Sequence, residues 1–211
     1  MALLAVLVFS GSIDLAKSEV GNFTVIIDPG HGGVDSGAIG ANGVEEKDIT
    51  LKIAQLVLRK SYQDPRLKVI LTRYTDRYVA PYDRTEFANK RRADIFVSVH
   101  ADSFGDPSIR GATTYVARKA QRQSNTLAKV VQNNLAVETR ATNRGTKRAS
   151  LFTREAKMPT ILVEVGFLSN PTEAEKLVTP SYQHKVASAL LHGIRQYVKT
   201  FHNESETSQA L

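Results

Sequence analysis

The chain has 211 residues, of which 42% are hydrophobic and 23% charged, values that fit one globular domain with a full core. It contains no cysteine, which excludes disulfides and thiolate ligands, so any metal must be bound through nitrogen and oxygen. The net charge of +7 is explained either by solvated helix faces and loops or by attraction to an anionic polymer. Tryptophan and the common nucleic-acid-binding motifs are absent, which argues against nucleic acid, and an acidic cell-wall polymer fits the charge equally well.

The first segment of the chain is the apolar run ALLAVLVF at residues 2–9. A bilayer span needs about 20 apolar residues, so this run is too short to cross a membrane, but its length suits the apolar part of a secretory signal. No lysine or arginine precedes it, and residues 10–18 offer only imperfect cleavage points, such as after Ala16. We expect residues 1–21 to be a signal peptide or apolar leader and the protein to be exported.

Strand-like and helix-like segments alternate along the rest of the chain. Apolar, β-branched runs predict strands at 24–28, 68–72, 94–99, 111–116 and 160–165. Helical spacing predicts helices at 48–60, 82–92, 121–139 and 182–198. This alternation indicates one α/β domain over 22–201, with a mostly parallel sheet covered by helices on both faces, followed by a flexible tail at 202–211.

One predicted strand departs from the alternation. The run GATTYV at 111–116 follows the preceding strand with no helix between them. A parallel pair needs a long crossover, whereas an antiparallel pair does not. We therefore expect this strand either to pair antiparallel or to lie at an edge of the sheet.

Two histidines and one glutamate lie at the carboxyl ends of the predicted strands. His31 follows the first strand within PGHGG, His100 ends the very apolar run IFVSVH, and Glu164 interrupts the last strand, TILVEV. In an open α/β sheet the carboxyl ends of parallel strands meet at one edge, and functional sites form there. Two imidazoles and nearby carboxylates are the ligands that a hydrolytic zinc site requires.

Glu164 is the least ambiguous of these positions. A carboxylate among isoleucine, leucine and valine costs several kcal/mol unless it is paired or neutralised. Burial would also raise its pKa toward the range of a general base or acid that works near neutral pH. An internal ion pair is the alternative explanation.

A catalytic zinc needs a third protein ligand, and two residues compete for that role. Glu45 and Glu46 both precede the first long helix, and their spacing does not decide between them. Asp28 and Asp102 lie close in sequence to the two histidines and are candidates to orient the imidazole rings, although a turn or cap role is equally compatible with them.

These motifs together make the chain similar to the zinc-dependent N-acetylmuramoyl-L-alanine amidases of the Amidase_3 family, from about residue 22 to residue 201. The motifs stand in the family's order: IDPGHGGVDSGAIG at 27–40, NGVEEKD at 42–48, DRTEFAN at 83–89, FVSVHAD at 96–102 and MPTILVEVGFLSNP at 158–171. Any one of them alone would be weak evidence. Their common order makes the resemblance specific.

The resemblance assigns roles that the residues alone leave open. It implies that His31, Glu46 and His100 hold Zn²⁺, which selects Glu46 over Glu45, and that Glu164 is the catalytic carboxylate. It also implies that Arg84 supports the site or binds substrate. The expected fold is a twisted sheet with helices on both faces. The expected reaction is cleavage of the amide between N-acetylmuramic acid and L-alanine of peptidoglycan.

The resemblance also bears on partners and regulation. We expect a monomer that binds peptidoglycan and no nucleic acid, in the periplasm or the extracellular cell wall, and whether a protein activates it is open. No inserted helix that would plug the metal site is evident between His100 and Glu164, and no separate wall-binding domain is expected. Two alternatives remain: a non-catalytic wall-binding module, and a zinc carboxypeptidase in which Arg84 or Arg148 holds a peptide carboxylate.

Overall fold

The computed structural model describes residues 23–209, with side chains described as far as Thr200. The predicted leader at 1–21 therefore lies outside the described residues. The strands are β1 (Phe23–Pro29), β2 (Leu67–Leu71), β3 (Ile95–Asp102), β4 (Ala112–Ala117), β5 (Asn143–Ala149) and β6 (Thr160–Phe167). The helices are α1 (Glu46–Ser61), α2 (Pro81–Lys90), α3 (Arg122–Thr139), the short 3₁₀ helix η1 (Phe152–Glu155), α4 (Pro171–Leu177) and α5 (Pro180–Gln209).

The strands form one sheet in the order β2-β1-β3-β6-β4-β5. All neighbouring pairs are parallel except β4 and β6, which pair antiparallel. The expectation for the strand at 111–116 is thus confirmed in its antiparallel form, and this strand is internal because β5 covers its other side. The carboxyl ends of β1, β3 and β6 lie at the same edge of the sheet.

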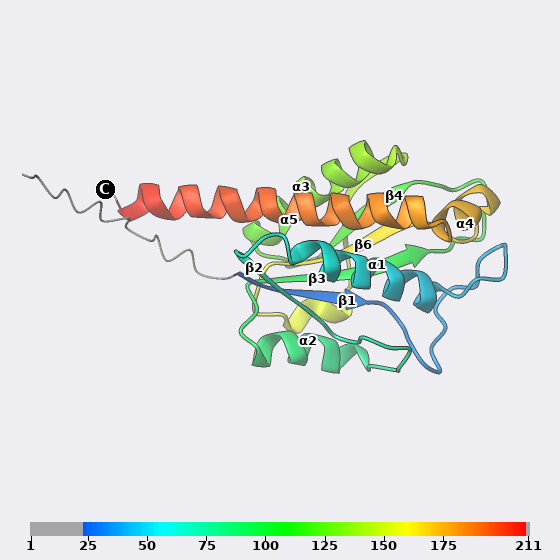
Figure 1. The fold of residues 1–211 in the computed structure, drawn as a ribbon, viewed down its shortest axis with the longest axis horizontal. Helices are drawn as coiled ribbons and strands as arrows, with labels where there is room; N and C mark the ends of the chain where they lie inside the picture. Colours follow the sequence, from blue (N-terminus) through cyan, green and yellow to red (C-terminus); the bar gives the residue numbers. More distant parts are fainter. Residues whose placement is uncertain (1–22, 210–211) are drawn as a thin grey trace, which may run out of the picture.

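Helices cover the sheet unequally. Figure 1 shows α1, α3 and α5 on one side of the sheet and α2 on the other. The large core lies under the first group, where alternate strand residues such as Ile27, Val97 and Val163 are completely buried against these helices. A smaller core, centred on Ile26 and Phe96, lies under α2 and η1. The mostly parallel α/β architecture expected from the sequence is confirmed.

Three elements were not expected. The strand β5 has the sequence NRGTKRA, which carries no apolar alternation, because it is an edge strand whose residues are mostly exposed. The helix α4 begins at Pro171 after the side chain of Asn170 caps its first turn, and η1 is a single turn. Short or exposed elements bury little surface and therefore leave little hydrophobic pattern to read.

Helix ends also differ from the expected positions. The helix α1 begins at Glu46, two residues before the predicted start at 48, so Glu46 lies in its first turn. The helix α5 runs to Gln209, whereas the sequence suggested a tail from 202, because no glycine or proline interrupts the polar end of the helix. None of the helices in the described part of the chain is both long and apolar enough to cross a bilayer.

Candidate metal centre

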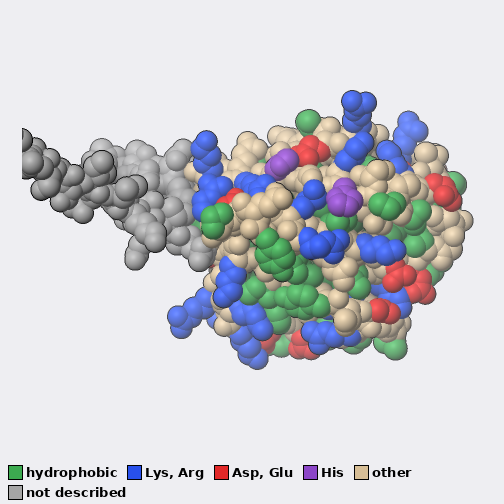
Figure 2. Space-filling model, in the orientation of Figure 1, with side chains coloured by type: hydrophobic (Ala, Val, Ile, Leu, Met, Phe, Trp, Pro, Cys, Tyr) green, Lys and Arg blue, Asp and Glu red, His purple; other side chains and the backbone are tan. Residues whose placement is uncertain are grey.

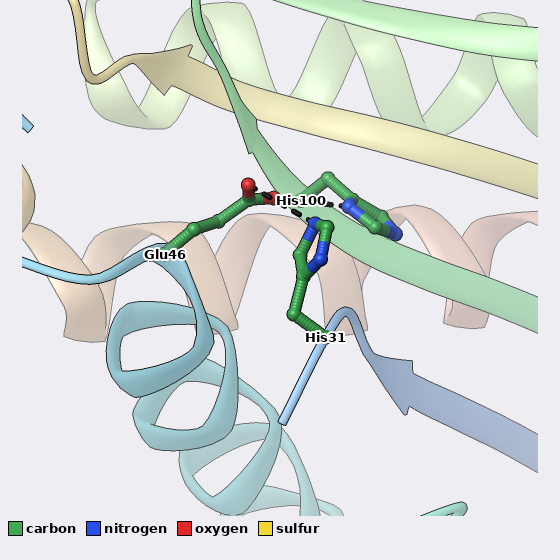
Figure 3. Close-up of side chains that lie close together, drawn as sticks. All are labelled: His31, Glu46 and His100. Atoms are coloured by element: carbon green, nitrogen blue, oxygen red, sulfur yellow. Dashed lines mark hydrogen bonds and ion pairs between the residues drawn. The ribbon is translucent and has the colours of Figure 1, made fainter. Parts of the chain in front are cut away.

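The donor atoms of His31, Glu46 and His100 converge at the carboxyl edge of the sheet, and all lie within 4.8 Å of one another. Figure 3 shows their origins: the loop after β1, the first turn of α1 and the end of β3. One Glu46 oxygen lies 3.1 Å from His31 Nε2, and the other lies 2.9 Å from His100 Nδ1. The two rings are nearly perpendicular, with centroids 4.9 Å apart.

Glycines make room for this convergence. A Cβ on Gly30 would collide with the His100 ring. A Cβ on Gly37 would lie 2.6 Å from both Glu46 Oε2 and His31 Cδ2, and Gly37 has a φ of +67°, which side chains other than glycine rarely adopt. The glycine-rich loop therefore serves the packing of the three donor side chains, and it does not form a phosphate cradle.

The backbone around His31 is held in an uncommon conformation. His31 has a φ of +59°, in the left-handed region. Its carbonyl accepts a 2.8 Å hydrogen bond from Arg84 Nη2, and the preceding carbonyl of Gly30 accepts one from Arg73 Nη2 at 2.7 Å. Arg73 is completely buried. These two guanidinium groups fix the direction in which the His31 side chain leaves the loop.

The aspartate beside the His31 ring is not the one that the sequence suggested. Asp35 Oδ1 lies 2.9 Å from His31 Nδ1, so Asp35 occupies the position that we expected for Asp28. Asp28 is fully buried and instead pairs with Arg84 at 2.8 Å, while its other oxygen accepts a hydrogen bond from Ser98. Asp28 therefore acts on the site indirectly, because it holds the arginine that holds the His31 backbone.

Glu164 lies beside the three converging donors. It is the direct cross-strand neighbour of His100 in the β3–β6 pair, so both side chains project from the same face of the sheet. Its Oε2 atom is buried and has no hydrogen-bond partner among the described residues. Burial, reinforced by the negative charges of Asp102 and Glu46, raises the pKa of Glu164 well above the usual range of a glutamate.

Asp102 does not contact the His100 ring as we expected. The hydrogen bond to its carboxylate comes from the Ser103 amide, and the contact of His100 Nδ1 is with Glu46. Burial raises the pKa of Asp102, while Arg144 on β5 opposes that shift. The guanidinium of Arg144 lies over the Phe167 ring at 5.1 Å, so β5 brings a positive charge to the edge of the site.

The three converging residues suit a divalent metal. Burial alone would raise the pKa of Glu46, but both histidines outweigh it and lower that pKa well below the usual range, so the carboxylate is ionised. Burial lowers the pKa of His31, and the contacts with Glu46 and Asp35 outweigh this and raise it. His100 Nε2 is buried without a partner among the described residues. Two imidazoles and one carboxylate are a typical set of zinc ligands, and Asp35 contacts the second nitrogen of the His31 ring as in many zinc sites.

Glu45, the competing candidate, is directed elsewhere. Its carboxylate lies 3.1 Å from Lys47 Nζ and is 40% exposed, whereas Glu46 is 5% exposed. Sequence reasoning missed Asp35, Arg73 and Arg144. Asp35 lies four residues after His31 in a loop, a separation that carries no periodic signal. The arginines come from an exposed-looking turn and from an edge strand, and only the packing of the sheet brings them to the site.

Comparison with known proteins places this site in a family. The model of the family described as N-acetylmuramoyl-L-alanine amidase (Amidase_3) matches residues 25–196, a range that contains all the residues of the site. AmiA, the N-acetylmuramoyl-L-alanine amidase of Escherichia coli K12, is 30% identical over 239 residues, which cover 92% of this chain and 82% of AmiA.

Solved structures are similar over the same region. The catalytic domain of the amidase CwlV from Bacillus (Paenibacillus) polymyxa var. colistinus has a TM-score of 0.80 and 37% identity, covering 84% of this chain and 98% of that domain. The CwlD amidase of Clostridioides difficile, solved in complex with the GerS lipoprotein, has a TM-score of 0.79 and 30% identity, covering 85% of this chain and all of that one.

Proposed function

This chain belongs to the N-acetylmuramoyl-L-alanine amidase family, and we propose that it works through a zinc ion held by His31, Glu46 and His100, with Glu164 as the catalytic carboxylate. Its reaction is the hydrolysis of the amide between N-acetylmuramic acid and L-alanine in peptidoglycan. The observation that carries the proposal is the convergence of these three donor side chains within 4.8 Å, beside a carboxylate whose buried oxygen has no partner among the described residues.

The donor set favours zinc over harder metals. Magnesium and calcium prefer oxygen ligands throughout, whereas two imidazole nitrogens and one carboxylate are typical of catalytic zinc. When bound, such a metal supplies Lewis acidity that lowers the pKa of a coordinated water and polarises a carbonyl. Asp35 keeps the proton on Nδ1 of His31, so that the other ring nitrogen is free to act as a ligand.

Glu164 moves the protons of the reaction. Burial raises the pKa of Glu164, which makes its carboxylate a stronger base toward the attacking water than an exposed glutamate would be. The water loses a proton to the Glu164 carboxylate as its oxygen bonds to the lactyl carbonyl carbon. Glu164 then donates that proton to the alanine nitrogen, because an amide nitrogen leaves poorly unless it is protonated. The carbon–nitrogen bond breaks, the C=O bond re-forms, and the products are the lactyl carboxylic acid and the free amine of L-alanine.

A carboxypeptidase is disfavoured by the positions of the two candidate arginines. The Arg84 guanidinium is buried, and four of its five N–H groups are donated to Asp28 and to backbone carbonyls, so it is poorly placed to bind a peptide carboxylate. Arg148 donates to the carbonyl of Arg118 and to Asn125 of α3, on the opposite face of the sheet from Glu164. Neither one faces the metal site.

The setting of the reaction follows from its substrate. Peptidoglycan lies outside the cytoplasm, so we infer that the protein is exported, which agrees with the apolar run at 2–9. The related CwlD amidase was solved with a lipoprotein partner, and this supports an accessory protein for the present chain as well.

Digestion of purified peptidoglycan tests the assignment of Glu164. We expect the zinc-loaded wild type to release stem peptides with free L-alanine amino termini and to leave the glycan intact, as read by mass spectrometry. The Glu164→Gln variant should bind an equal amount of zinc but release no peptide. Release of peptide by this variant at the wild-type rate would refute the role of Glu164, while release of a terminal amino acid by the wild type would indicate a carboxypeptidase.

A further inference from the structure

A cavity in the protein lies apart from the metal centre. It has a volume of about 490 Å³ and is bordered by the end of β4, the start of α3, the end of β5, η1 and the start of β6. Because β4 runs antiparallel to β6, this cavity is at the edge of the sheet opposite to His31 and His100. It contains none of the residues assigned to the reaction.

The lining of the cavity is cationic. Arg118, Lys119 and Arg154 border it against a single acidic residue, Glu155. Arg118 and Lys119 are exposed and form no ion pair within the described part of the chain, so their charges are available to a ligand. Thr153, which also borders the cavity and is 3% exposed, has a buried hydroxyl that lacks a hydrogen-bond partner among the described residues.

The amino-terminal end of α3 adds to this positive potential. The 18-residue helix begins at Arg122, beside the cavity, and neither an acidic residue in its first turn nor a side-chain cap at Gln121 neutralises its free amide groups. Helix amino termini attract anions through these amides and the helix dipole. Together with the unpaired side chains, they favour a ligand that carries a carboxylate or a similar anionic group.

One wall of the cavity lies on the same face of the sheet as the catalytic carboxylate. On β6, Ile161, Val163 and Val165 point into the large core, so Thr160 and Glu164 point to the other side. Thr160 borders the cavity. Glu164 is four positions after Thr160, a distance of roughly 13 Å along the strand. Between them lie the half-buried Tyr115 and, on β5, its exposed neighbour Lys147.

We propose that this cavity is a substrate subsite that binds the carboxyl terminus of the stem peptide while its first amide bond lies at Glu164. The proposal rests on the assignment of Glu164 as the catalytic carboxylate. An extended peptide advances about 3.3 Å per residue, so a stem of about four residues spans the same distance as Glu164 to Thr160. The subsite makes the enzyme selective for stems of this length that end in a free carboxylate.

Kinetics on two defined muropeptides test the proposal. Both carry a four-residue stem on N-acetylmuramic acid, one with a free terminal carboxylate and one with that carboxyl converted to a primary amide. For the wild type we expect kcat/KM to be about five- to tenfold higher on the free acid, mainly through a lower KM, because charge-assisted hydrogen bonds add binding that the amide lacks. In the double variant Arg118→Ala, Lys119→Ala, this preference should disappear, because kcat/KM on the free acid falls toward the value measured on the amide.

A matched control separates this effect from a general loss of positive charge. The double variant Lys52→Ala, Arg59→Ala removes two exposed charges from α1, on the other side of the sheet, and should keep the wild-type preference. The single variant Arg154→Ala should weaken the preference in part. An unchanged preference in the Arg118 and Lys119 variant, or equal losses on both muropeptides, would overturn the subsite. Absence of hydrolysis of either muropeptide by the wild type would instead count against the amidase mechanism.

Discussion

Two glutamates beside the same pair of imidazoles have opposite electrostatic environments. Glu46 receives contacts from both histidines, which hold its pKa far below the usual value, so its carboxylate remains charged. Glu164 is desolvated and lies near two other carboxylates, which raises its pKa. A pair of acids whose pKa values are driven apart is typical of a site that binds with one and transfers protons with the other.

Asp35 provides a test of how the His31 ring is oriented. Its carboxylate contacts Nδ1, so the Asp35→Asn change should weaken zinc affinity about 10- to 100-fold without unfolding the protein. Competition with a chromophoric chelator measures this affinity. The control is Asp106→Asn, which alters an exposed carboxylate that accepts a hydrogen bond from the Ser108 amide. Equal zinc affinity of the Asp35 variant and the wild type would show that the ring is oriented by other contacts.

Arg84 provides a test of the support beneath the loop. The Arg84→Ala change leaves the fully buried Asp28 without its counter-charge and frees the His31 carbonyl. Removal of one partner from a buried pair costs about 3–5 kcal/mol, so the free energy of unfolding should fall by that amount in urea titrations. A loss below about 1 kcal/mol would indicate that the pair is solvated in solution.

At the level of the elements, α3 and α5 pack closely against each other at Gly193. A Cβ on Gly193 of α5 would lie 2.8 Å from the Val131 Cα atom in α3, which is backbone and cannot move aside cheaply. We expect Gly193→Ala to lower the free energy of unfolding by about 1–2 kcal/mol, since overpacking outweighs the higher helix propensity of alanine. Gly105→Ala is the control, because a Cβ on Gly105 would meet no atom within 4 Å. Thermal unfolding of both variants measures the difference. A stabilised Gly193 variant would contradict this packing.

A salt bridge between elements should give stability that depends on pH. Asp64, after α1, accepts hydrogen bonds from Arg66 and from Arg195 of α5, and these lower the pKa of Asp64 to about 2. Because its folded pKa is depressed, the stabilisation is present above the unfolded value, near 4, and is lost as the pH falls through 2. Asp64→Asn should cost about 1 kcal/mol at pH 7, since Arg66 is partly exposed, and almost nothing at pH 2. A pH-independent difference in chemical denaturation would contradict the assignment.

How well the sequence predicts each element depends on how much apolar surface that element buries. The strands β1, β3 and β6 are buried on both faces and were readable as apolar runs, and their common direction explains why His31, His100 and Glu164 meet. Edge strand β5 and helix α4 left no such pattern. The partners of the proposed metal ligands were also beyond prediction, because Asp35 and Arg73 approach His31 only after the glycine-rich loop has folded back on α1.

On the scale of the whole molecule, positive charge extends well beyond the site. Figure 2 shows lysine and arginine side chains spread over the visible face, with fewer acidic side chains among them, in line with the net charge of +7. Long-range attraction between exposed charges is screened within about 8 Å at physiological salt. The affinity for acidic cell walls should therefore fall by a factor on the order of ten when the salt concentration rises from 50 to 500 mM. Sedimentation of the protein with insoluble walls measures this affinity. Salt-independent binding would show that the surface charge plays no part.

The location of the metal is the most direct test of the whole account. Anomalous diffraction at the zinc edge, from crystals of the zinc-loaded protein, should give one strong peak about 2.0–2.2 Å from an imidazole nitrogen of His31, an imidazole nitrogen of His100 and a carboxylate oxygen of Glu46, with Glu164 outside bonding distance. A peak bound elsewhere, or one that requires Glu164 as a ligand in place of Glu46, would contradict the account.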